Sequence, residues 1–142
     1  MSQSTISSSP NAAVAASGTP VGMLWTGRVI SGVVSAALIF SGVMKFTNSP
    51  DLVEGLGHLG WPVRFAPALG VTELTCVVLY LIPQTSALGA ILLTGYMGGA
   101  IATHARIEEG FIPHIIIGVL VWLGLFLRDA RLRALIPIRR GR

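Results

Sequence analysis

Apolar residues fill four long stretches of the chain, and polar residues gather in the segments between them. A helix that crosses the hydrocarbon core of a membrane needs about 20 mostly apolar residues, with a range of about 17 to 25. The fourth stretch lies at or below the lower limit, and would need Phe111 or local bilayer thinning to span. The pattern predicts four membrane-spanning helices, at about residues 23–44, 64–82, 87–105 and 112–127.

The longest polar connection, residues 45–63, joins the first two apolar stretches. Ser49 precedes Pro50 in the pattern of a helix N-cap, so a short helix is predicted to begin there. Three glycines are expected to break this helix soon afterwards: Gly55, Gly57 and Gly60. We therefore expect a partly helical cap over one end of a four-helix bundle.

The composition is that of a membrane protein. The chain is 52% hydrophobic and only 11% charged, whereas soluble domains carry roughly 25% charged residues. Basic residues are not interleaved with aromatic ones over a surface, which argues against nucleic-acid binding. The single cysteine, Cys76, excludes an intrachain disulfide and a CxxC redox pair.

The two ends of the chain are expected to be tails. Residues 1–22 are rich in Ser and Ala and lack the basic start of a secretory signal, so a disordered tail is predicted. Residues 128–142 form a predicted basic tail that contacts anionic lipid headgroups. Because four spans place both termini on one side and basic residues favour the cytoplasm, we predict a cell-membrane protein with both termini cytoplasmic. The basic residues of this tail are Arg128, Arg131, Arg133, Arg139, Arg140 and Arg142.

Glu73 is the strongest candidate for chemistry. It lies about nine residues into the second apolar stretch, or about 13 Å along a helix that rises about 1.5 Å per residue, near the bilayer midplane. An ionisable residue at that depth faces the bundle interior and suggests a functional site. The structural alternative is a protonated Glu73 that is hydrogen-bonded to a backbone carbonyl or to a serine of the first span.

Arg106, which follows the third span, is one candidate partner of Glu73; Lys45 and His104 are the other two, since each ends a predicted span on the same side. Both are expected to lie several ångströms shallower than Glu73, so contact would need a tilted helix or a bridging water. We expect a quinone or lipid pocket near Glu73, Met97, His104 and Trp61.

A metal site is not expected. His58 and His104 with Glu54 match no recognisable metal motif. His114 is interpreted as an interface residue, and the adjacent Glu108 and Glu109 as solvated loop residues.

Small residues are expected to bring the helices close together. One side of the third span carries Gly95, Gly98, Gly99 and Ala102, a small-xxx-small ridge on which a neighbouring helix can pack. The first span carries a similar stripe of Gly27, Ser31 and Ser35.

Three segments together resemble the DoxX-like family of small four-helix membrane proteins: "SGVMKF", "HLGWP" and "LGVTELTCVVLYLIPQTSALGAILLTGYMGGAIATH". The resemblance covers roughly residues 29–127. The positions that match the family pattern are Lys45, Gly60-Trp61-Pro62, Glu73, Pro83-Gln84-Thr85, Leu88-Gly89-Ala90 and His104. The family takes its name from a subunit associated with a thiosulfate:quinone oxidoreductase, and some relatives are linked to oxidative stress or to membrane-protein assembly.

The resemblance implies a quinone- or proton-linked subunit of a membrane redox complex, an accessory subunit rather than a free-standing enzyme. The chain carries no cofactor motif of its own, so any electrons must come from a partner, and a quinone is the candidate cofactor. A non-enzymatic scaffold or assembly factor is one alternative, and a small-solute or proton carrier is another. A second membrane protein, or further copies of this chain, is the expected partner besides the lipid bilayer.

Overall fold

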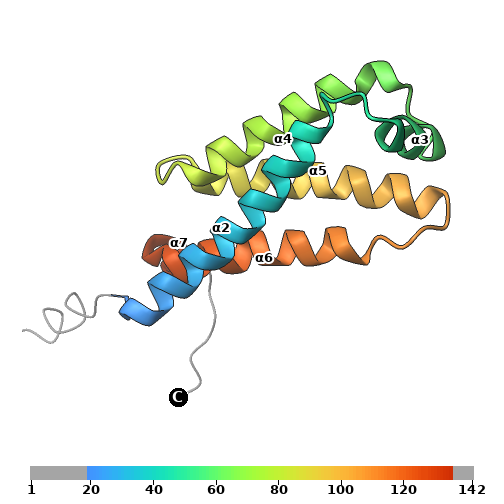
Figure 1. The fold of residues 1–142 in the computed structure, drawn as a ribbon. Helices are drawn as coiled ribbons and strands as arrows, with labels where there is room; N and C mark the ends of the chain where they lie inside the picture. The colour runs from blue at the N-terminus through green and yellow to red at the C-terminus, as the bar shows by residue number, and fades with distance from the viewer. Residues whose placement is uncertain (1–18, 136–142) are drawn as a thin grey trace, which may run out of the picture.

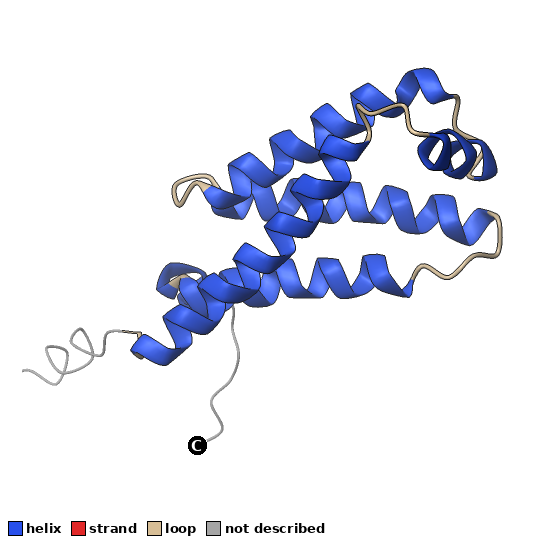
Figure 2. Ribbon diagram, in the orientation of Figure 1, coloured by secondary structure: helices blue, strands red, loops and turns tan. Residues whose placement is uncertain are grey.

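The computed structural model describes residues 19–135, and within this range the chain is helical with no strand (Figures 1 and 2). Four long helices form a bundle, and three short helical segments accompany them. The long helices are α2 (Val21–Met44), α4 (Ala66–Leu81), α5 (Ser86–Arg106) and α6 (Ile112–Arg128). The short ones are α3 (Pro50–His58), the 3-10 turn η1 (Val63–Phe65) and α7 (Ala130–Leu135).

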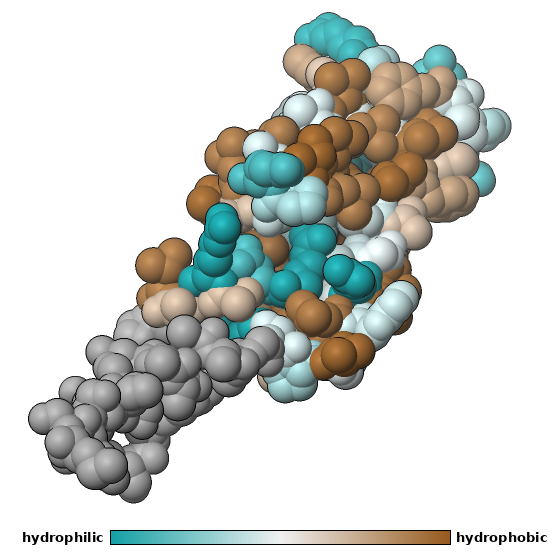
Figure 3. All heavy atoms as spheres, turned by 90° about the vertical axis from the view of Figure 1, so that its left-hand side faces the viewer, coloured by the Kyte–Doolittle hydropathy of each residue, from teal (hydrophilic) through white to brown (hydrophobic). Residues whose placement is uncertain are grey.

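Three helical segments are long and apolar enough to cross a membrane: Val21–Met44, Val63–Leu81 and Ser86–Arg106. The fourth apolar helix, Ile112–Arg128, is shorter, as the sequence predicted. Large apolar side chains such as Val33 and Phe40 are exposed, and Figure 3, which faces the left-hand side of Figure 1, shows large apolar areas beside a hydrophilic patch. An apolar surface of this kind suits contact with lipid.

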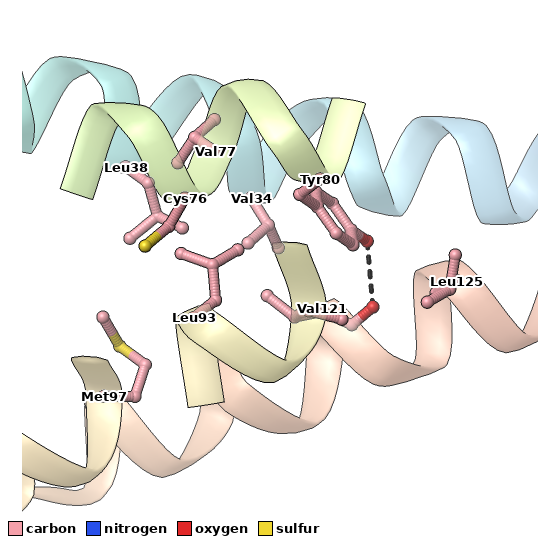
Figure 4. Close-up of a cluster of buried hydrophobic side chains, with 10 residues drawn as sticks. Val34, Leu38, Cys76, Val77, Tyr80, Leu93, Met97, Val121 and Leu125 are labelled. Carbon is pink, nitrogen blue, oxygen red and sulfur yellow. Dashed lines mark hydrogen bonds between the residues drawn. The ribbon is translucent and has the colours of Figure 1, made fainter. Parts of the chain in front are cut away.

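The four long helices pack in a ring in which α2 contacts α4 and α6, and α5 contacts α4 and α6. Buried residues from all four helices meet in one hydrophobic core (Figure 4). Tyr80 is fully buried there, and its hydroxyl donates a hydrogen bond to the Val121 carbonyl at 2.9 Å. The Ser31 hydroxyl lies 2.9 Å from the same tyrosine oxygen. This polar contact ties α2, α4 and α6 together inside the core.

The helix predicted after Ser49 is α3, and the Ser49 hydroxyl accepts a hydrogen bond from the Leu52 backbone at 3.3 Å. The predicted break was placed too early, because Gly55 and Gly57 lie inside α3. A single glycine in a helix costs only about 1 kcal/mol, which the neighbouring residues offset. Gly60, with φ of +74°, follows the helix end and turns the chain toward α4.

The predicted small-residue stripe of α2 does pack closely against a neighbour. A methyl group added to Gly27 would stand 2.9 Å from the Gly124 carbonyl oxygen of α6. The predicted ridge on α5 is wrong, because a methyl group at Gly95, Gly98 or Gly99 would meet nothing within 4 Å. A wheel places small residues on one side of a helix, but another helix must lie there for them to pack.

The first part of the predicted C-terminal tail, residues 128–135, is folded. Arg128, the last residue of α6, donates a hydrogen bond to the Tyr80 carbonyl at 2.7 Å. Arg133 of α7 donates hydrogen bonds to the carbonyls of Phe126 and Leu127 at 2.9 and 2.8 Å. These two arginines therefore satisfy backbone carbonyls at helix ends. Residues 136–142, with the other predicted tail arginines except Arg131, lie outside the described residues, as do residues 1–18 of the predicted N-terminal tail.

The described chain starts and finishes at one end of the bundle, where the Arg133 side chain donates a hydrogen bond to the Thr19 hydroxyl. Helix α3 and the α5–α6 loop lie at the opposite end (Figure 1). This second end holds the polar residues that the sequence singled out.

Candidate functional site

Glu73 lies in the middle of α4 and is 1% exposed. Lys45, which caps the C-terminus of α2, places its Nζ 2.7 Å from Oε2 of Glu73. The same Nζ lies 2.9 Å from the Ser41 hydroxyl, one helical turn back. Lys45 was predicted to lie several ångströms shallower than Glu73. Its side chain nevertheless reaches Glu73 directly, without a bridging water, because its long stem runs back along α2.

Two hydroxyl groups complete the surroundings of the same oxygen. Tyr96 of α5 donates a hydrogen bond to Glu73 Oε2 at 3.2 Å, and Ser41 donates one at 3.4 Å. An oxygen that accepts from an ammonium and two hydroxyl groups is arranged as an ionised carboxylate, which accepts but does not donate. The protonated Glu73 considered as the alternative would instead donate to a carbonyl or serine oxygen.

A cavity of about 420 Å³ opens beside this ion pair. Its walls come from α2, α4, α5 and α6, and the cap contributes Leu56, Leu59 and Trp61. Oε1 of Glu73 accepts no hydrogen bond from the described residues, and Glu73 lines the cavity. One carboxylate oxygen is therefore left for a molecule in the cavity. All four residues of the predicted pocket line this cavity, namely Glu73, Met97, His104 and Trp61.

His104 lines the same cavity but makes no hydrogen bond or ion pair with Glu73, and Arg106 bonds to the Leu59 carbonyl, so Lys45 is the candidate partner that reaches the carboxylate. The rings of His104 and His114 lie 4.4 Å apart between centroids. His114 also lines the cavity and is therefore more than the interface residue that the sequence suggested. Outside the cavity, Nε2 of His58 lies 2.8 Å from Oε1 of Glu109.

Glu54, weighed as a metal ligand with His58 and His104, is exposed on α3. Among residues 19–135, no three His, Cys, Asp or Glu side chains are grouped so that they could hold a metal ion. A metal centre is accordingly not assigned here.

The comparison with protein families matches residues 29–127 to the model of the DoxX-like family. The chain belongs to the DoxX-like family. No curated protein and no solved structure matches it. The match covers α2 from Val29, all of α4 and α5, α6 up to Leu127 and all the cavity residues, so the ion pair and the cavity lie inside the shared domain.

Tyr96 of the DoxX-like site was not predicted from the sequence, and Ser41 was anticipated only as a serine of the first span without a number. Both could have been found from helical spacing, because side chains that are one or two turns apart share a face. Ser41 lies four residues before Lys45, and Tyr96 lies eight residues before His104. Neither hydroxyl group was singled out, because each lies in a mostly apolar stretch of the sequence.

Proposed function

We propose that this DoxX-like protein binds a quinone, or a lipid with a comparable polar head, in the cavity beside Glu73. It would serve as an accessory subunit of a membrane redox complex, with electrons supplied by a partner protein. The observation that carries the proposal is the largely buried Lys45–Glu73 ion pair in the wall of a mostly apolar cavity. Taking two charges out of water is costly, so such a pair suggests a use beyond packing.

The residues present fit a quinone headgroup. Oε1 of Glu73 can accept a hydrogen bond from a hydroxyl group, and Lys45 has three N–H donors of which one can turn toward a carbonyl oxygen. Leu38, Met97 and Ile117 line the apolar part of the cavity, where a hydrocarbon chain or the edge of a ring can lie. A quinone, when bound, supplies coupled electron and proton transfer. This chain would hold the headgroup and keep bulk water from it.

The proposal includes a topology. We place α2, α4, α5 and α6 across the cell membrane with both termini in the cytoplasm. The support is the concentration of arginines after α6, together with the rule that cytoplasmic segments carry the basic excess. Helix α3 and the cavity mouth would then face the outer side. The C-terminal arginines would lie where anionic lipid headgroups can bind them.

A scaffold or assembly function is the second candidate, because one face of the bundle is open to a partner. A shallow groove between α5 and α6 is lined by Gly98, Gly118 and Trp122. Gly98 and Gly118 have nothing within 4 Å of an added methyl group, so another membrane helix or a further copy of this chain can approach closely.

The experiment that tests the quinone proposal uses two glycines of α5. The full chain is purified in mild detergent, and the quinone content per chain is measured by mass spectrometry of the lipid extract. Gly99→Leu places a side chain into the cavity, whereas Gly98→Leu places one into the groove outside it. Neither glycine has a neighbour within 4 Å of an added methyl group, so both variants should fold.

We expect near-stoichiometric quinone in the wild type and in Gly98→Leu, and loss of quinone in Gly99→Leu and in Glu73→Gln. Bulk phospholipid alone in the wild-type extract would count against quinone binding. Equal quinone in the two leucine variants would show that the cavity is not the site. Stable co-purification of a second membrane protein with the wild type, lost in Gly98→Leu alone, would favour the scaffold function.

A further inference from the structure

Titratable side chains lead from the exposed surface to the cavity. His58, whose side chain is 63% exposed, places Nε2 2.8 Å from Oε1 of Glu109. The other carboxylate oxygen, Oε2, lies 4.0 Å from Nε2 of His104, whose side chain is only 20% exposed. One bridging water or a small rotation of the Glu109 side chain spans that gap. His104 in turn lines the cavity.

A hydrogen bond at Nδ1 of His104 determines which of its two ring nitrogens can exchange a proton. Nδ1 of His104 lies 2.8 Å from the carbonyl oxygen of Ala100. A carbonyl only accepts, so Nδ1 carries a hydrogen and donates it whether the ring is neutral or charged. The neutral ring therefore has its free lone pair on Nε2, the atom nearest Glu109. Protonation and deprotonation occur at the nitrogen that faces the path to the surface.

We propose that His104 exchanges protons between a molecule in the cavity and the aqueous surface, through Glu109 and His58. This deepens the proposed function and rests on it. A proton from water passes through Glu109, directly or after His58, to Nε2 of His104, which becomes an imidazolium while Nδ1 stays bonded to Ala100. Release of the Nε2 proton to a basic oxygen in the cavity returns the ring to neutral. One proton leaves water and one reaches the bound molecule.

The charges around His104 suit this role. Glu109 lies beside Nε2 of His104 on the loop side, while His114 packs against the ring from α6. Glu73 and Lys45 line the same cavity and are already paired with each other. Arg106 is bonded to the Leu59 carbonyl at 2.7 Å and helps to hold the cap beside the path. Of the two histidines that line the cavity, His104 is the one whose ring lies beside Glu109.

A chromogenic phenol tests the relay in the full chain. A 2-nitrophenol that carries a decyl chain is bound to the protein in lipid nanodiscs, and its ionisation is followed by visible absorption after a rapid pH jump. We expect the ionisation rate to fall about a hundredfold in Glu109→Gln and in His104→Gln, the lower end of what a positioned acid–base group contributes. Glu108→Gln, the neighbouring exposed carboxylate, is the matched control and should exchange at the wild-type rate. Wild-type rates in all three variants would overturn the relay.

A measurement without any ligand separates the relay from the proposed function. Deuterium exchange at the imidazole C2 position of His104, measured by mass spectrometry across pH, reports protonation of that ring. We expect a titration in the wild type whose midpoint moves in Glu109→Gln and stays in place in Glu108→Gln. A His104 rate that does not change with pH, or that responds equally to the two variants, would overturn the relay. Failure of the wild type to bind the nitrophenol would count against the cavity ligand instead, while the exchange at His104 still decides the relay.

Discussion

Removal of Lys45 should destabilise the protein more than removal of the charge on Glu73. The two atoms of the pair are 2.7 Å apart, but the side chains are unequally buried, with 16% of Lys45 and 2% of Glu73 exposed. Lys45→Met leaves a carboxylate charge in the bundle interior with only the Ser41 and Tyr96 hydroxyl groups to stabilise it. Breaking a buried ion pair in this way costs about 3–5 kcal/mol. The two hydroxyl groups place the expected loss near the lower value.

Glu73→Gln should cost less, about 1.5–2 kcal/mol, which is the lower part of the range for the loss of a hydrogen bond to a charged group. Lys45 keeps its contacts with Ser41, and its ammonium can reach solvent, so no charge is stranded. The glutamine amide also keeps an oxygen that can accept from Tyr96. The order of the two losses follows from burial and not from the pair distance, which is the same for both.

The free energy of unfolding can be measured for both variants, and for Lys45→Met/Glu73→Gln, by titration with sodium dodecyl sulfate in mixed micelles. Because the double variant strands no charge, it should lose less than the sum of the single losses, with a coupling of at least about 1 kcal/mol. The exposed Glu108→Gln serves as control and should lie within about 0.5 kcal/mol of the wild type. Equal losses in the two single variants, or additive losses in the double variant, would refute the reasoning.

Three further predictions concern packing and topology. Gly89→Ala should cost about 3 kcal/mol of unfolding free energy, since a methyl group there would stand 2.2 Å from the Tyr80 backbone nitrogen. Gly98→Ala should gain about 0.5–1 kcal/mol, since a methyl group there meets nothing within 4 Å. Equal effects of the two variants in the same titration would contradict the helix packing. Tyr80→Phe removes the hydroxyl bonded to Val121 and Ser31, so the unfolding free energy should fall by about 1–3 kcal/mol, and an unchanged value would show that this contact is dispensable. A C-terminal fusion to a reporter that works only in the cytoplasm should be active. Activity of a C-terminal reporter that works only on the outer side would reverse the proposed topology.

The helices could be predicted from the sequence because composition and length control them. A run of about 20 apolar residues has few alternatives to a helix in lipid, where every backbone polar group must be bonded within the segment. The start of α3 was equally readable, because Ser49 and Pro50 act within one turn of chain. The end of α3 was not, because a glycine only weakens a helix and the surrounding contacts decide whether it breaks.

The site was predictable in part. Glu73 and Lys45 stand out because a charge in an apolar stretch is costly wherever the helices lie. His114 becomes a site residue only through the position of α6 beside the cavity, and its local sequence carries no comparable signal. The approach of Lys45 to Glu73 depended on side-chain reach, which the rise of a helix per residue does not describe.

The prediction that a neighbouring helix packs on the α5 glycines was wrong, and this bears directly on function. Small residues were expected to draw a neighbouring helix close, yet Gly95 and Gly99 line the cavity with no atom within 4 Å of an added methyl group. The same lack of a side chain that permits close packing elsewhere here leaves room beside the Tyr96 hydroxyl and Glu73. If the space served only packing, a larger residue at Gly99 would fill it at little cost and stabilise the bundle. A Gly99→Leu chain that is as stable as the wild type but has lost its bound quinone would therefore show that the glycine serves binding.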